Sequence, residues 1–139
     1  MIVVIRISGL IGIEKRKREA LERLMLRKKF TAILIHEKEL PKLLNVKDFI
    51  AFGKIDEKTL RMLLAARGKK DNKPLSAVTD SIVKGLLEEK TTLKKEGLKP
   101  YFGLHPPRGG FKNKSLKLGY PIGVTGKNDK INELIQRML

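Results

Sequence analysis

The sequence predicts a small α/β sandwich in which helices cover one face of a β-sheet. Within residues 1–55, three segments rich in β-branched and aromatic residues read as strands, at residues 2–7, 31–35 and 49–55. Helical patterns separate these segments, so the order of elements is βαβαβ. This order in so short a stretch is typical of one layer of helices packed on a sheet.

Each N-terminal element has a local signal. Residues 14–27 form an amphipathic helix. Pro41 suits the first turn of a short helix over residues 40–45, and Gly53 indicates a bulge in the third strand. The long helix places these residues on its core-facing side: Ile13, the stem of Lys17, Ala20, Leu21, Leu24 and Met25.

The chain after residue 55 reads as further helices joined by polar segments. Asp56 is placed to cap a helix over residues 57–67, which Gly68 ends. Residues 69–73 are polar and precede a proline, as expected of a linker.

Two more helices are expected in this half. One begins after Ser76 or Thr79 and runs to about residue 90, and Asn128 or Asp129 caps the last one. We therefore expect a βαβαβ core at residues 1–56 and a C-terminal extension at residues 57–139.

The charge balance predicts an anionic partner. Lys and Arg number 31 against 15 Asp and Glu, which is a formal net charge of +16 on 139 residues. Nucleic acid is the commonest partner of so basic a protein, and an anionic membrane surface is the second. The hydrophobic content of 41% still permits a packed core.

Several classes are disfavoured by composition. The absence of cysteine excludes disulfides, thiolate metal sites and cysteine nucleophiles. His36 and His105 alone are too few for a typical zinc site, and no catalytic constellation stands out. No segment reads as a membrane span or a signal peptide, so we expect a soluble intracellular protein without a metal or cofactor.

A basic loop is the most informative segment. Residues 104–112 read Leu-His-Pro-Pro-Arg-Gly-Gly-Phe-Lys, within a stretch from 97 to 127 that holds six Lys or Arg residues and no acid. The two prolines stiffen the backbone, and the two glycines let it approach a ligand closely. This combination predicts a loop shaped to lie on a polyanion.

Arginines on the first helix form a second candidate contact. Arg16, Arg23 and Arg27 recur along one flank of the predicted helix, and Lys28 and Lys29 continue the charge beyond its end. The alternative is a solvated helix face with local acidic partners.

Aromatic residues gather near the basic loop. Tyr101, Phe102, Phe111 and Tyr120 lie within twenty residues of one another. They are either platforms on which RNA bases stack or rings that cover the core beneath a long loop.

Residues 123–128 have the end of a phosphate-binding loop but lack its first glycine and its hydroxyl residue, so nucleotide hydrolysis is not expected.

Four ordered motifs resemble a known family, the ribosomal protein L-thirty family of the large subunit, in its long archaeal and eukaryotic form. They are Leu-Glu-Arg-Leu-Met-Leu-Arg-Lys-Lys at residues 21–29, Val-Lys-Asp-Phe-Ile-Ala-Phe-Gly-Lys-Ile-Asp at 46–56, the His-Pro-Pro-Arg-Gly-Gly-Phe loop at 105–111, and Ile-Asn-Glu-Leu-Ile at 131–135. A basic N-terminal extension typical of eukaryotic members is missing, which favours an archaeal type.

The resemblance implies an α+β fold, namely a ferredoxin-like core with a three-stranded, mainly antiparallel sheet and two helices, plus a helical and loop-rich extension. It also implies a structural role in the large ribosomal subunit in the cytoplasm, with large-subunit rRNA, 5S rRNA and neighbouring ribosomal proteins as partners. The candidate RNA-binding residues are Arg16, Arg23, Arg27, Lys28, Lys29, His105, Pro106, Pro107, Arg108, Gly109, Gly110, Phe111, Lys112, Lys114 and Lys117.

Three alternatives remain open from the sequence. One is a small enzyme of the acylphosphatase type, although residues 9–12 lack the arginine that its phosphate loop needs. Another is a non-ribosomal RNA-binding protein. The third is a peripheral membrane protein that uses the first helix, although that helix is expected to turn its apolar face towards the sheet.

Overall fold

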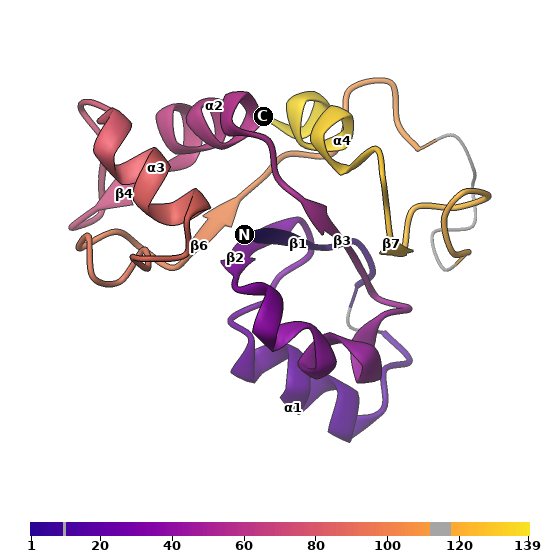
Figure 1. The fold of residues 1–139 in the computed structure, drawn as a ribbon. Helices are drawn as coiled ribbons and strands as arrows, with labels where there is room; N and C mark the ends of the chain where they lie inside the picture. The colour runs from indigo at the N-terminus through magenta and orange to yellow at the C-terminus, as the bar shows by residue number, and fades with distance from the viewer. Residues whose placement is uncertain (10, 112–117) are drawn as a thin grey trace.

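The computed structural model describes residues 1–9, 11–111 and 118–139, and a five-stranded sheet forms its centre (Figure 1). The strand order is β6-β2-β1-β3-β7. These strands are β1 (Ile2–Arg6), β2 (Thr31–Ile35), β3 (Ile50–Lys54), β6 (Tyr101–Gly103) and β7 (Gly126–Lys127). All neighbouring pairs are antiparallel except β3 and β7, so the fold is α+β with a mainly antiparallel sheet, as expected.

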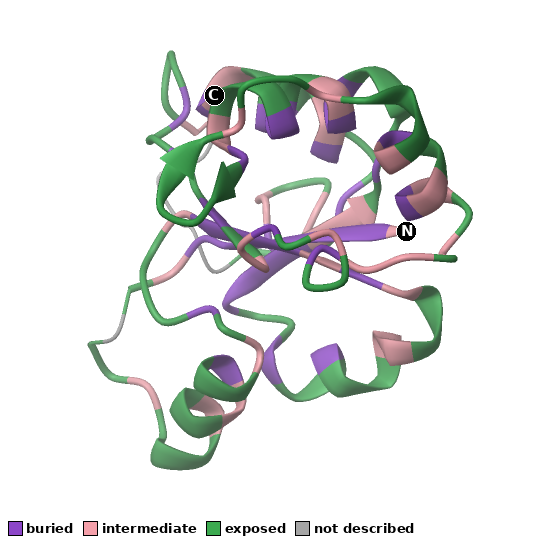
Figure 2. Ribbon diagram, turned by 90° about the vertical axis from the view of Figure 1, so that its left-hand side faces the viewer, coloured by how far each residue is buried: buried purple, intermediate pink, exposed green. Residues whose placement is uncertain are grey.

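Both faces of this sheet are buried, and this explains why β1 is apolar at successive positions. Val3 and Ile5 point into one core, whereas Ile2 and Val4 point into a second core on the opposite face. The expectation of helices on one face only was wrong. Figure 2 shows the buried sheet between an upper and a lower layer of helices.

The lower layer consists of α1 (Lys15–Arg23) and the 3-10 helix η1 (Glu37–Val46). Leu21 of α1 and Leu43 of η1 are buried against the sheet in the same cluster. The upper layer consists of α2 (Glu57–Arg67), α3 (Asp80–Leu87) and α4 (Ile131–Met138). Their buried leucine, valine and isoleucine side chains complete the other core, the one that contains Val3 and Ile5.

The C-terminal part of the chain extends the sheet at both edges. Strand β6 pairs with β2, and β7 pairs with β3 in parallel, so the expected three-stranded sheet has five strands. Two- and three-residue strands have too few positions for an alternating pattern, which is why the sequence did not predict them. The division of the chain at residue 56 stays a prediction.

Helix α1 ends four residues earlier than expected, at Arg23. Met25 adopts a left-handed φ of 62°, is 39% exposed, and does not lie on the core-facing side of the helix. Leu26 is fully buried in its place. Arg27 therefore does not lie on the flank of the helix, as had been predicted, but in the segment that follows it.

Other local predictions also needed correction. The 3-10 helix η1 covers Glu37–Val46 with Pro41 inside it, where a short helix over residues 40–45 had been expected. The expected linker contains a hairpin of β4 (Lys69–Lys70) and β5 (Lys73–Pro74). Asp71 and Asn72, at its turn, have φ angles of 48° and 66°, as a tight hairpin turn requires.

Helices α3 and α4 begin close to their predicted starts. Thr79 precedes α3, which ends at Leu87 and not near residue 90. Lys130 is the residue that precedes α4, and its main-chain N–H donates to the side chain of Asn128 at 2.9 Å.

Gly53 marks a close approach and not a bulge. Its pairing with Val3 is in regular register, but a Cβ at this position would lie 2.6 Å from the carbonyl oxygen of Asn128. The glycine therefore lets the start of α4 pack directly on β3. No helix in the described residues is long and apolar enough to cross a membrane.

Candidate nucleic-acid interface

A buried arginine holds the chain that follows α1. Arg6 of β1 is fully buried, and its guanidinium donates to the carbonyl oxygens of Leu26 at 2.7 Å and Arg27 at 2.9 Å. It also donates to the carbonyl oxygens of Ser8 at 3.0 Å and Gly9 at 3.1 Å. One side chain thus holds both the turn after β1 and the start of residues 27–30, which we call the 27–30 segment.

No carboxylate contacts the buried guanidinium of Arg6 among the described residues. Burial lowers its pKa, the nearby Arg18 cation adds to this, and Glu22 opposes it. An arginine stays charged at neutral pH even so. The 27–30 segment therefore carries a fixed positive charge behind it in addition to its own cations.

Phe30 joins the 27–30 segment to the basic loop, whose described part at residues 104–111 we call the 104–111 loop. The N–H of Phe30 donates to the carbonyl of Arg6 at 2.8 Å, and the carbonyl of Phe30 accepts from the N–H of Leu104 at 2.9 Å. The rings of Phe30 and Phe111 stack with centroids 6.4 Å apart. Two segments about 75 residues apart in the chain therefore lie side by side.

A second arginine holds the 104–111 loop. Nε of Arg137, in the last turn of α4, donates to the carbonyl of Arg108 at 3.0 Å, and Nη2 donates to the carbonyl of Gly110. In return, the N–H of Arg108 donates to the carbonyl of Arg137 at 2.9 Å. Gly109 and Gly110 adopt φ angles of 78° and 70°, which disfavour other residues.

The 27–30 segment and the 104–111 loop carry most of the predicted RNA-binding residues that the structure describes. Arg27, Lys28 and Lys29 are exposed in the 27–30 segment. In the loop, His105, Pro106, Arg108, Gly109 and Gly110 are exposed, Phe111 is partly buried and Pro107 is buried. Arg16 and Arg23 are exposed on α1. Lys112, Lys114 and Lys117 lie outside the described residues.

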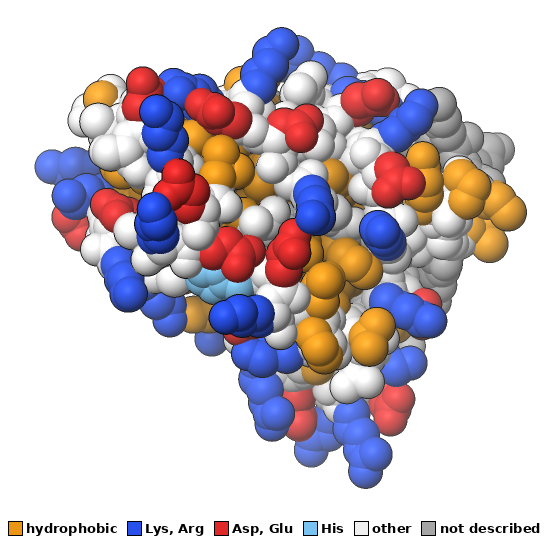
Figure 3. All heavy atoms as spheres, in the orientation of Figure 1, with side chains coloured by type: hydrophobic (Ala, Val, Ile, Leu, Met, Phe, Trp, Pro, Cys, Tyr) orange, Lys and Arg blue, Asp and Glu red, His pale blue; other side chains and the backbone are white. Residues whose placement is uncertain are grey.

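The described cations among the predicted RNA-binding residues have no acidic partner, which is also true of most other described Lys and Arg residues. Arg16, Arg23, Arg27, Lys28, Lys29 and Arg108 form no ion pair within the described residues. In contrast, Lys42 pairs with Glu39, Arg61 with Glu57 and Asp80, and Lys90 with Glu88. Figure 3 shows acidic and basic side chains interspersed over the side that carries α2 and α3.

The predicted aromatic cluster divides between two roles. Phe102 is 1% exposed and belongs to the core. Tyr101 is exposed beside the ammonium of Lys99, and Phe111 and Tyr120 are partly buried near α4. Of the four rings, Phe102 is therefore the one that is fully buried.

Sequence reasoning missed Arg6, Phe30 and Arg137. Each is a positioning residue whose partners lie far away in the chain, so no local motif marks it. The one available signal was Arg6 itself, because a charged residue inside an otherwise apolar strand needs hydrogen-bond partners.

The fold and the two segments define a small basic α+β protein in which two adjacent acid-free segments are suited to a polyanion. No group of three or more potential metal ligands occurs in the described residues.

No family model matches the chain. The chain is similar over its full length to the large ribosomal subunit protein uL30 of Methanosphaera stadtmanae, with 34% identity and 100% of both chains covered. The uL30 proteins of Korarchaeum cryptofilum and Staphylothermus marinus are 36% and 38% identical, covering 100% and 98% of this chain and 95% and 96% of their own. The chain belongs to the uL30 family. This membership confirms the predicted resemblance and excludes the acylphosphatase alternative, since the relatives are named as ribosomal proteins and not as enzymes.

Proposed function

We propose that this protein is a structural component of the large ribosomal subunit in the cytoplasm. It binds large-subunit rRNA through the 27–30 segment and the 104–111 loop, with 5S rRNA among its contacts and other ribosomal proteins as neighbours. The observation that carries the proposal is the convergence of these two acid-free segments, each held by an arginine through its main chain.

The chemistry of the surface matches a phosphate backbone. Arg27 and Arg108 carry planar guanidinium groups that bind phosphate oxygens in pairs, whereas Lys28 and Lys29 act as point charges. A Cβ at Gly110 would meet no atom of the described residues within 4 Å, so these residues leave the main chain open on that side. RNA is able to approach the backbone closely there.

The anchoring of both segments raises affinity without adding contacts. Binding costs less when the ligand-facing backbone is already ordered, because less conformational entropy is lost. Arg6 and Arg137 supply this order from the protein side. The role is structural, since the surface orders a fold of RNA and transforms no substrate.

The test compares two charge-matched double variants. Lys28→Gln with Lys29→Gln removes two unpaired cations from the proposed surface, and Lys42→Gln with Lys90→Gln removes two that are ion-paired elsewhere. We expect the first pair to lower the slope of log affinity against log salt by about 1.5. Each lost phosphate contact removes roughly 0.7 to 0.9 from that slope. The second pair is expected to change it little. Equal effects of the two pairs on rRNA binding would contradict the proposed surface.

Two further experiments test the proposed partners, the large subunit and 5S rRNA. The native protein is expected to sediment with the large subunit and to leave it only at high salt. Binding to a 5S rRNA transcript alone is measured against binding to a large-subunit rRNA fragment. Affinity for the fragment with none for the transcript would remove 5S rRNA from the proposal and leave the rest intact.

A further inference from the structure

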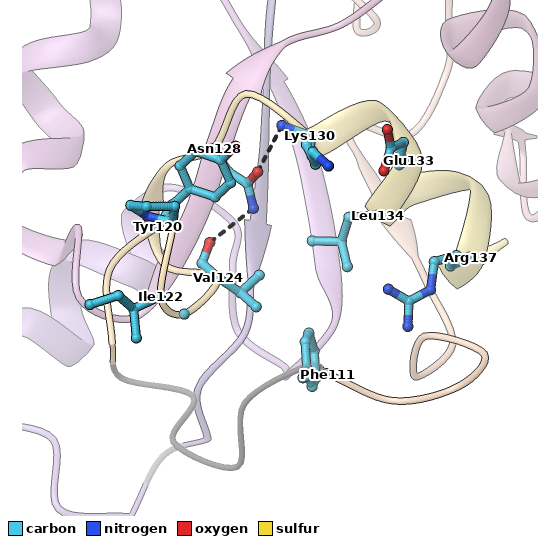
Figure 4. Close-up of a pocket in the computed structure, with 11 residues that line it drawn as sticks. Phe111, Tyr120, Ile122, Val124, Asn128, Lys130, Glu133, Leu134 and Arg137 are labelled. Carbon is cyan, nitrogen blue, oxygen red and sulfur yellow. Dashed lines mark hydrogen bonds between the residues drawn. The ribbon is translucent and has the colours of Figure 1, made fainter.

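A pocket opens between α4 and the chain that leads into β7. Its volume is about 250 Å³, and its lining residues include Phe111, Tyr120, Ile122, Glu133, Leu134 and Arg137. Figure 4 shows Leu134 and Arg137 of α4 facing the loop that carries Tyr120, Ile122 and Val124, with Phe111 below them. The cavity has no evident role in the packing of the two cores, and the phosphate contacts proposed for the two basic segments do not use it.

The size and walls of the pocket fit a single aromatic ring system. Its volume lies just below the range of about 300 to 1,000 Å³ that accommodates drug-sized ligands. Phe111 and Tyr120 provide flat faces, while Val124 and Leu134 provide aliphatic contact. Unstacked RNA bases are recognised by this combination of aromatic faces and a few polar groups.

The polar groups of the pocket are suited to bind the edge of a base, with the phosphates of the same strand outside the pocket. Glu133 contributes a carboxylate, which accepts N–H groups of a base and repels a phosphate. Lys130 and Arg137 also line the pocket, and neither forms an ion pair within the described chain. The cations are suited to the backbone on either side of an inserted base.

The pocket is continuous with the proposed RNA surface. Arg137 lines the pocket and also holds the carbonyls of Arg108 and Gly110 in the 104–111 loop. Phe111 ends this loop, stacks on Phe30 of the 27–30 segment and lines the pocket. An RNA strand that follows the loop therefore passes the mouth of the pocket.

We propose that this pocket receives one unpaired nucleobase of the bound rRNA. The proposal rests on the proposed rRNA-binding function and adds a site that reads a base and not only the backbone. A protein side chain is the competing occupant, and the charges on α4 together with the continuity with the loop favour RNA.

The principal experiment measures binding of Tyr120→Leu to a large-subunit rRNA fragment at several salt concentrations. The matched control is Tyr101→Leu, which removes an exposed tyrosine on β6 outside the pocket. We expect affinity to fall about 5- to 150-fold for the pocket variant, the range for loss of one stacked base, and little for the control. The salt dependence is expected to stay unchanged because no phosphate contact is lost.

A second pair of variants, at exposed positions, tests whether the loss of affinity in the first pair comes from misfolding. Ile122 is 68% exposed at the pocket and Leu44 is 63% exposed on η1, so aspartate at either position leaves the core intact. Ile122→Asp is expected to weaken RNA binding at least fivefold, and Leu44→Asp to leave it unchanged. Base-specific chemical probing is expected to show one nucleotide that wild-type protein protects and Tyr120→Leu exposes.

The outcomes separate this proposal from the proposed function. Wild-type affinity and an unchanged footprint in both pocket variants, while Lys28→Gln with Lys29→Gln still binds weakly, would overturn the pocket proposal alone. Wild-type affinity in that lysine variant as well would overturn the proposed function too. Loss of retention in the assembled subunit without loss of affinity for naked RNA would identify a protein occupant and overturn the base-binding proposal.

Discussion

The two basic segments are held by the same device at very different depths. In both, an arginine donates to main-chain carbonyls that lie just behind exposed cations. Arg6 belongs to the central strand and is fully buried, whereas Arg137 lies in the last turn of α4 and is partly buried. The 27–30 segment is therefore coupled to the core, and the 104–111 loop to one helix end.

Because the two arginines differ in burial, we expect one to affect mainly the stability of the fold and the other mainly RNA affinity. Loss of a fully buried donor set leaves carbonyls without partners in a place that water does not reach, which destabilises the whole fold. Loss of a partly exposed donor set lets water replace it, so only the local shape is lost. The first arginine is expected to matter for folding and the second for affinity.

The largest expected effect follows substitution of Arg6, the fully buried arginine, which we call the deep anchor. Arg6→Met leaves the carbonyls of Leu26 and Arg27 without their donor, and we expect it to lower the free energy of unfolding by roughly 3 to 5 kcal/mol. Urea denaturation measures this value. Arg6→Lys, which keeps the charge but has a single donor centre, is expected to fall between the wild type and Arg6→Met. A wild-type midpoint for Arg6→Met would show that the segment is not coupled to the core.

A smaller and different effect is expected at Arg137, the partly buried arginine, which we call the shallow anchor. Arg137→Met removes two bonds to the 104–111 loop, so we expect about a tenfold loss of rRNA affinity with a change of only about 1 kcal/mol in unfolding free energy. Both quantities are measured on one preparation. If the loss of stability exceeded that of Arg6→Met, the comparison between the two anchors would be reversed.

The smallest expected effect tests the backbone of the loop itself. Gly110 has a φ of 70°, and no atom of the described residues lies where a Cβ would be, so we expect Gly110→Ala to cost about 1 kcal/mol through backbone conformation. Gly103 also has open space but no positive φ, and Gly103→Ala serves as the matched control. Thermal unfolding and rRNA affinity are compared for both. Equal results for the two variants would show that the shape of the loop does not depend on its glycine.

The elements with strong local patterns followed from the sequence. The second strand at residues 31–35 and the helix at residues 57–67 were predicted at their observed bounds, and the first strand within one residue. Their periodicity and breakers lie within a few residues of one another, so short-range rules are sufficient, although the side chain of Asp56 forms no capping hydrogen bond. The basic loop and its exposed glycines were equally visible, since composition and backbone restriction are local properties.

The sequence by itself determined the α+β class, the basic character of the surface and most of the residues that present it. Only the tertiary structure decided that helices cover both faces of the sheet, that α1 ends at Arg23, and that the 27–30 segment meets the 104–111 loop. The roles of Arg6 and Arg137 belong to this second group. Their partners are carbonyl groups about 20 and 27 to 29 residues away, and every residue carries a carbonyl, so no residue type identifies them before the chain is folded.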